Sequence, residues 1–115
     1  MLQNTDPQNV SFCLDLHWIF RGSMDSELAV FDVIKMYGNR IAELHIRQSK
    51  QGIWSETFTA QGDIDYDKVV KELKNLKIKP HLCIEQAVEN GSPSTMDAVS
   101  AHKITLKEII STFQI

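Results

Sequence analysis

Short apolar runs and longer amphipathic segments alternate three times along the chain. The apolar runs are rich in strand-forming residues and occupy residues 10–16, 41–46 and 81–85. After each run, apolar residues recur at the three- and four-residue spacing of a helix that buries one side. These stripes cover residues 28–36, 69–76 and 104–110. The pattern therefore predicts three consecutive strand–loop–helix units.

Polar residues mark the limits of the predicted helices. Asp25 and Ser26 precede the first helix, and Asp65 precedes the second. Side chains of these types accept hydrogen bonds from the free N–H groups of a helix start. Gly38 and Pro80 follow the two helices and are typical of helix ends. We expect three connecting loops. The first contains Gly22, and the other two span residues 48–63 and 87–95.

Strands that alternate with helices at this spacing indicate an α/β fold with a parallel sheet. A complete (β/α)₈ barrel usually takes about 250 residues, so three units cannot close into a barrel. An isolated three-stranded parallel sheet has two open edges and one uncovered face. We therefore expect either a fragment of a longer product or a sheet completed by another chain, and we favour the fragment.

Composition narrows the class of protein. The chain has 115 residues, of which 43% are hydrophobic and 23% charged, as in an ordinary folded domain. Its net charge of −3 and scattered basic residues argue against nucleic-acid binding. No apolar run approaches the roughly 20 residues that cross a bilayer, and the N-terminus lacks signal-peptide features, so we predict a cytoplasmic protein without membrane contact. Cys13 and Cys83 lie in apolar runs and are expected to be reduced, buried thiols.

Each predicted strand ends in a residue that can bind a metal ion. These residues are Asp15, His45 and Glu85. In α/β barrels, catalytic groups lie at the carboxyl ends of the strands. Two carboxylates and an imidazole suit Mn²⁺, Mg²⁺, Co²⁺ or Zn²⁺. The alternative is that the two carboxylates cap neighbouring loops and the histidine is a hydrogen-bonded core residue.

Strand alternation provides a check on this placement. Every second residue of a strand points to the same face, so Asp15 shares its face with Cys13, and His45 shares its face with Glu43. The opposite face of all three strands is apolar, as packing against helices requires. Glu43 and His81 lie deeper on the polar face, where we expect hydrogen-bonded pairing rather than catalysis.

Four stretches of the chain resemble a known family. They are residues 12–18 (FCLDLHW), 39–47 (NRIAELHIR), 61–66 (QGDIDY) and 82–86 (LCIEQ). In this order and spacing they resemble strands six to eight of the sugar phosphate isomerase/epimerase group within the xylose isomerase-like TIM barrel superfamily. The resemblance implies that residues 1–115 form the C-terminal part of such a barrel. It does not identify a substrate.

The resemblance also implies a metal site of four ligands: Glu, Asp, His and Glu. Three of them match Asp15, His45 and Glu85, and the fourth belongs to a strand that this sequence does not contain. Glu85 would be one member of a glutamate pair that moves the proton beside a carbonyl. The chain would then lack one metal ligand and one catalytic glutamate, and it would need another chain to become a competent enzyme.

The same resemblance suggests four substrate-binding residues. His17 could contact a sugar hydroxyl, while Trp18 and Arg21 would lie on a loop over the pocket. Arg47 could pair with a phosphate or hydroxyl group. The alternatives are a Trp18 packed under its own loop and an Arg47 that is an ordinary surface cation. The chain departs from the family pattern at Gln48, where an acidic residue is expected, at Ala60, where glycine is expected, and at His17, where tyrosine is common.

These features predict a metal-dependent isomerase or epimerase that acts on a sugar or sugar-like polyol. Its partners would be that small molecule and the missing part of the barrel, or further copies in an oligomer. One alternative is a dehydratase or lyase acting on a keto-sugar or inositol derivative with the same ligands. Others are a truncated, non-catalytic barrel and a repair endonuclease of the same fold, for which additional metal-binding histidines are not found.

Overall fold

The computed structural model describes residues 2–115, which form one parallel sheet, one small hairpin and four α-helices. The strands are β1 (Phe12–Asp15), β2 (Ile41–Ile46), β3 (Ser49–Lys50), β4 (Ile53–Trp54) and β5 (His81–Ile84). The helices are α1 (Leu16–Gly22), α2 (Glu27–Tyr37), α3 (Tyr66–Asn75) and α4 (Ala98–Phe113), with short 3₁₀ turns at Leu2–Asn4 and Gly38–Arg40.

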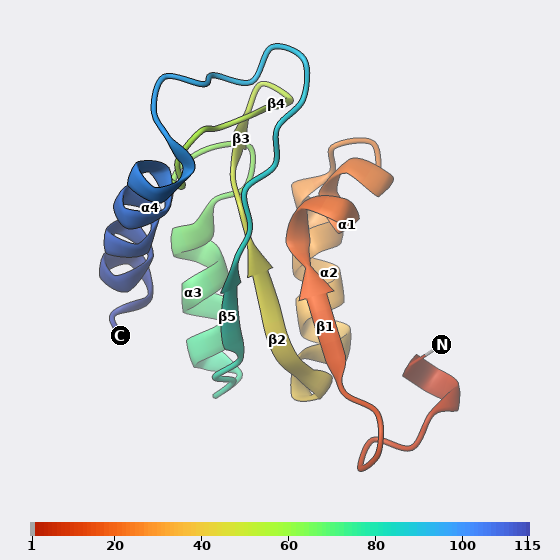
Figure 1. The fold of residues 1–115 in the computed structure, drawn as a ribbon. Helices are drawn as coiled ribbons and strands as arrows, with labels where there is room; N and C mark the ends of the chain where they lie inside the picture. The colour runs from red at the N-terminus through yellow and green to blue at the C-terminus, as the bar shows by residue number, and fades with distance from the viewer. Residues whose placement is uncertain (1) are drawn as a thin grey trace.

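The main sheet has the order β1-β2-β5, and both pairs of neighbours are parallel. In register, Cys13 lies opposite Glu43 and Asp15 opposite His45, while His45 also lies opposite Cys83 on β5. Figure 1 shows α2 and α3 behind this sheet and α4 beside β5. The predicted α/β class with a parallel sheet is therefore confirmed.

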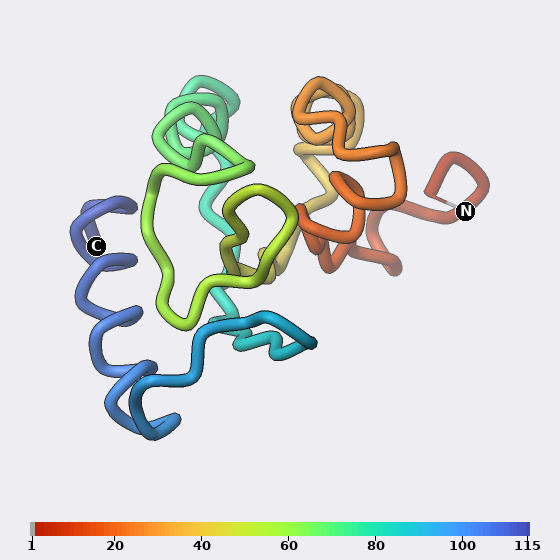
Figure 2. The backbone as a smooth tube through the Cα atoms, turned by 90° about the horizontal axis from the view of Figure 1, so that it is seen from above, coloured from red at the N-terminus to blue at the C-terminus, as the bar shows by residue number. Residues whose placement is uncertain are grey.

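The core lies between the sheet and its helices. Leu14, Leu44 and Ile46 from the strands are fully buried, together with Val30 and Val69 from α2 and α3. Each such side chain contributes about 1.5–3 kcal/mol through burial. Seen from above in Figure 2, α2 and α3 lie along one side of the sheet. The described residues place no helix on the opposite face, which carries the polar side chains of the alternating pattern.

The helix starts follow the predicted capping residues. Ser26 accepts a hydrogen bond from the backbone N–H of Ala29 and begins α2, and Asp65 accepts one from Lys68 and begins α3. Asp97 does the same for α4. A cap of this kind is worth about 1 kcal/mol.

The first strand is shorter than predicted, and a helix replaces the expected loop around Gly22. β1 ends at Asp15, whose side chain accepts a hydrogen bond from the Trp18 backbone N–H and so starts α1 directly at the strand end. Trp18 and Arg21 therefore lie on a helix and not on a loop. β5 also ends one residue early, yet the Glu85 N–H donates to Ile46 O at 3.0 Å, which continues the pairing.

The predicted loop 48–63 contains the β3–β4 hairpin and a buried amide. The Gln48 side chain is 2% exposed, and its Nε2 donates to Thr59 O at 3.0 Å and to Ile64 O at 2.9 Å. Gly62 passes so close that a Cβ there would lie 2.3 Å from Gln48 Cδ. Gln48 thus ties the start of this segment to its end. None of the helices within residues 2–115 has the length and apolar character needed to cross a membrane.

Replacing Gln48 with glutamate tests this cross-link. The variant Gln48→Glu would bury a carboxylate against two carbonyl oxygens, with no donor left for either of them. We expect the free energy of unfolding to fall by about 2–4 kcal/mol. Urea unfolding of the variant and of Gln8→Glu, an exposed position, provides the measurement and its control. Equal stability of the two variants would contradict the role assigned to Gln48.

Candidate metal centre

Asp15, His45 and Glu85 meet at the carboxyl ends of the three parallel strands. Asp15 is the last residue of β1, His45 lies beside it in register on β2, and Glu85 directly follows β5. One ligand atom from each residue lies within 4.8 Å of the others. The structure thus brings together all three predicted ligands, which we call the carboxylate site.

Arg47 lies between the two carboxylates of this site. It follows His45 by two residues and so points to the same side of the sheet. One Nη atom forms an ion pair with Asp15, and the other lies 3.3 Å from Glu85 Oε1. The guanidinium carbon is 4.9 Å from the ring centre of Trp18 and 4.8 Å from that of Trp54. With 5% exposure, Arg47 is not the surface cation of our alternative interpretation.

His45 is held between two glutamates. Its Nε2 lies 3.0 Å from Glu43 Oε1, and its Nδ1 lies 3.4 Å from Glu85 Oε2. Burial acts to lower the pKa of His45, but the hydrogen bonds to Glu43 and Glu85 outweigh it and hold the pKa above its ordinary value. Hydrogen bonds from Cys13 and His45 in turn lower the pKa of Glu43. The expected pairing role of Glu43 is therefore seen in its contacts.

His17, which was predicted to contact a substrate, is fully buried. Its ring lies 5.1 Å from that of Trp54 and stacks on Tyr66, and its Nε2 lies 3.3 Å from Ser49 Oγ. Burial, together with the charges of Arg47 and Arg21, lowers the pKa of His17 to about 3. His17 is thus a neutral packing residue beneath the site.

The two remaining predicted substrate-binding residues differ in accessibility. Trp18 is 59% exposed on α1, beside the guanidinium of Arg47. Arg21 is engaged by the protein: it pairs with Glu89 at 2.8 Å, donates to Gly52 O at 2.8 Å and stacks on Trp54 at 3.7 Å. Arg21 thereby links α1 to the hairpin and to the segment after β5, and Trp18 retains a free ring face.

Trp54 is a central residue of the site that sequence reasoning missed. It is 3% exposed and contacts Arg21, Arg47 and His17 through its ring. The only signal in the sequence is a tryptophan inside a polar stretch. The loop folds back and places the indole of Trp54 against two cations. No periodic pattern in the sequence of the loop predicts this position.

The donor set fits a divalent cation. Ligand atoms at the usual distances of about 2.0–2.2 Å from an ion lie about 3–4.4 Å from one another. The distance of 3.4 Å between His45 Nδ1 and Glu85 Oε2 falls in this range. Asp15 Oδ1 already accepts from the Trp18 N–H, but a carboxylate oxygen has a second lone pair for an ion. Arg47 is the group that would compete with a cation.

Comparison of the chain with family models, curated proteins and solved structures finds no match.

The lowered pKa of His17 predicts a specific dependence of stability on pH. The unfolded chain takes up this proton near its ordinary pKa of 6.5, whereas the folded chain does so only near 3. Stability is therefore full above pH 6.5 and falls as the pH drops below it, by about 1.4 kcal/mol per unit.

Between pH 7 and pH 5, the free energy of unfolding of His17→Leu should fall by about 2 kcal/mol less than that of the unchanged protein. Urea unfolding of both proteins at the two values measures it, because the other titrating groups cancel in the difference. Parallel pH profiles of the two proteins would show that the folded protein binds this proton as readily as the unfolded chain does.

Proposed function

We propose that this chain forms three units of a xylose isomerase-like TIM barrel and supplies three ligands to the metal site of a sugar isomerase or epimerase. The observation that carries the proposal is the convergence of Asp15, His45 and Glu85, whose ligand atoms lie within 4.8 Å at the carboxyl ends of three parallel strands. Parallel barrels use this end of the sheet for catalysis.

The arrangement of the sheet supports the barrel. Its strands follow chain order, and α2 and α3 cover one face only. Doubly wound sheets instead place helices on both faces, with a reversal of strand order. Within residues 2–115, the outer edges of β1 and β5 and the polar face have no partner strand or layer. Further barrel strands, from the same protein or another chain, are the partner we propose.

Each residue of the site has a distinct role in this proposal. A bound divalent ion would polarise a substrate carbonyl or hold neighbouring hydroxyl oxygens. Glu85 takes and returns the proton on the carbon beside that carbonyl. Arg47 fixes the orientation of Glu85, to which it pairs at 3.3 Å. Trp18 offers its exposed ring to the apolar face of a sugar.

Metal binding is the first test. Purified chain is titrated with Mn²⁺, and bound ion is measured per chain. We expect one ion, and an affinity that falls at least about tenfold in Asp15→Asn and Glu85→Gln. Asparagine can still cap α1, so the first variant keeps the start of this helix. Asp32→Asn, on the exposed side of α2, is the matched control and should bind as the unchanged chain does.

Catalysis is tested with a keto-sugar in D₂O at saturating Mn²⁺, on the chain joined to the strands that complete its barrel. Deuterium should enter the carbon beside the carbonyl, and Glu85→Gln should abolish the exchange. Loss of water from the substrate would assign the chain to the dehydratase or lyase alternative. Metal binding without either reaction would favour a non-catalytic barrel, and the absence of Mn²⁺ binding would overturn the proposed site.

Replacing Arg47 is expected to strengthen Mn²⁺ binding, whereas replacing a ligand weakens it. The variant Arg47→Met removes a positive charge from between Asp15 and Glu85 but keeps an apolar stem between the two indoles. We expect Mn²⁺ affinity to rise by about tenfold or more, since two carboxylates lose their competing cation. Lys107→Met, an exposed position on α4, controls for the change in net charge. A weaker affinity would mean that Arg47 is needed to organise the ligands.

A further inference from the structure

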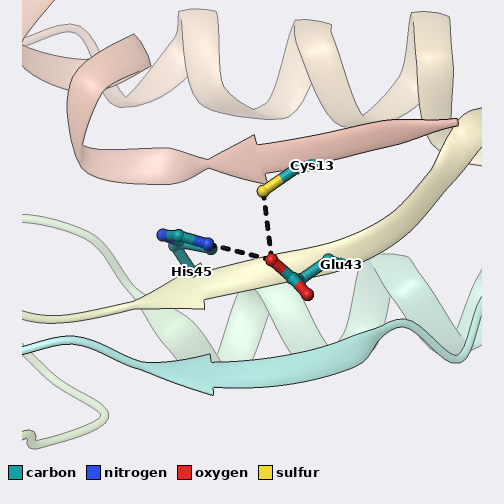
Figure 3. A group of neighbouring side chains, drawn as sticks. All are labelled: Cys13, Glu43 and His45. Carbon is teal, nitrogen blue, oxygen red and sulfur yellow. Dashed lines mark hydrogen bonds and ion pairs between the residues drawn. The ribbon is translucent and has the colours of Figure 1, made fainter.

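A second group of metal-competent side chains lies next to the carboxylate site, on the same face of the sheet. It consists of Cys13 from β1 and of Glu43 and His45 from β2, which we call the thiol site (Figure 3). Cys13 Sγ donates to Glu43 Oε1 at 3.3 Å, and His45 Nε2 lies 3.0 Å from the same oxygen. All three ligand atoms lie within 4.8 Å of one another.

The register of the sheet produces this group. Cys13 and Glu43 are direct partners in the β1–β2 pairing, and His45 is the next residue of β2 on the same face. Both cysteines are free, but neither is buried as predicted: Cys13 is exposed and Cys83 is partly exposed, because both lie on the uncovered polar face. Cys83 belongs to β5, two strands away from Cys13. Two strand spacings amount to about 9–10 Å, too far for a disulfide. The Cys13 thiol is therefore available to another partner.

The spacing of the donors matches the coordination of zinc. Zinc binds sulfur at about 2.3 Å and nitrogen or oxygen at about 2.0–2.2 Å in a tetrahedron, which places neighbouring ligand atoms about 3.3–3.6 Å apart. Glu43 Oε1 lies 3.3 Å from Cys13 Sγ and 3.0 Å from His45 Nε2, close to this range, and all three ligand atoms lie within 4.8 Å of one another. A thiolate and an imidazole favour Zn²⁺ over Mg²⁺ or Mn²⁺, which prefer oxygen ligands.

We propose that Cys13, Glu43 and His45 form a second cation site, which binds Zn²⁺ through Sγ, a carboxylate oxygen and Nε2, with water in the fourth position. Binding replaces the two hydrogen bonds to Glu43. The thiol proton of Cys13 passes to solvent, and the neutral ring of His45 keeps its proton on Nδ1. No electron is transferred.

His45 belongs to both sites, but it can coordinate a metal ion in only one of them at a time. A neutral imidazole has one ring nitrogen with a free lone pair. Its Nδ1 faces Glu85 of the carboxylate site, and its Nε2 faces Glu43 of the thiol site. Zn²⁺ at the thiol site therefore withdraws the histidine from the carboxylate site. This last step, competition between the sites, rests on the proposed function; the thiol site itself does not.

The test uses Co²⁺ as a spectroscopic substitute for Zn²⁺ on the full chain. A thiolate ligand produces a sulfur-to-cobalt charge-transfer band in the near ultraviolet. We expect this band in the unchanged chain and in Cys83→Ser, and its loss in Cys13→Ser. Zn²⁺ should bleach the band with one equivalent. Absence of the band, its survival in Cys13→Ser or its loss in Cys83→Ser would each overturn the assignment.

Affinities separate this inference from the proposed function. We expect Cys13→Ser to weaken Zn²⁺ binding by at least about tenfold and to leave Mn²⁺ affinity unchanged. Asp15→Asn should weaken Mn²⁺ binding and leave the cobalt band in place, and His45→Ala should impair both ions. If Mn²⁺ does not bind but the Cys13-dependent band is present, the proposed function fails and the thiol site stands. Equal loss of both ions in Cys13→Ser would refute a distinct thiol site.

Discussion

The carboxyl end of the sheet depends on one buried cation. Removing a guanidinium from water costs several kcal/mol unless charged partners replace the solvent. Arg47 obtains these partners from two other strands: Asp15 ends β1 and Glu85 follows β5. The rings of Trp18 and Trp54 lie against the group, while its Nε finds no hydrogen-bond partner among the described residues. The three strand ends are thus held together by ion pairs as well as by the hydrophobic core.

The carboxylates of this arrangement serve more than one purpose. Asp15 caps α1 through one oxygen and pairs with Arg47 through the other, while Glu85 divides its oxygens between Arg47 and His45. This explains how acidic side chains can converge without repelling one another. A divalent ion at this position would have to share these oxygens or displace Arg47.

Strand periodicity was enough to predict the sheet and the residues that line its polar face. Ile41–Ile46 was predicted to the residue, and Asp15 and His45, which were both placed at strand ends, are register partners. Ser26 and Asp65 marked helix starts because capping is a local interaction. The sequence patterns do not reveal contacts between distant segments, such as the burial of His17 against Trp54 from the hairpin.

Loop residues were also hard to predict from the sequence, because their structure depends on contacts with other segments. Residues 48–63 are polar in sequence, yet Gln48 is buried because the carbonyls of Thr59 and Ile64 satisfy its amide. A glutamine in a polar stretch is predicted to be exposed, because the hydrogen bonds that allow its burial come from positions far along the chain. α1 was missed for a related reason: one carboxylate ends a strand and caps a helix at the same time.

The chemistry of the polar face limits what can lie against it. Barrel interiors are usually filled by branched apolar side chains. Here the side chains of this face are Cys13, Asp15, Glu43, His45, Arg47, His81, Cys83 and Glu85, none of them aliphatic. Carboxylates covered by an apolar layer would lose their remaining hydration, which Arg47 and His45 replace only in part. A layer that covered this face would therefore need to bring hydrogen-bonding groups, cations or ordered water to it.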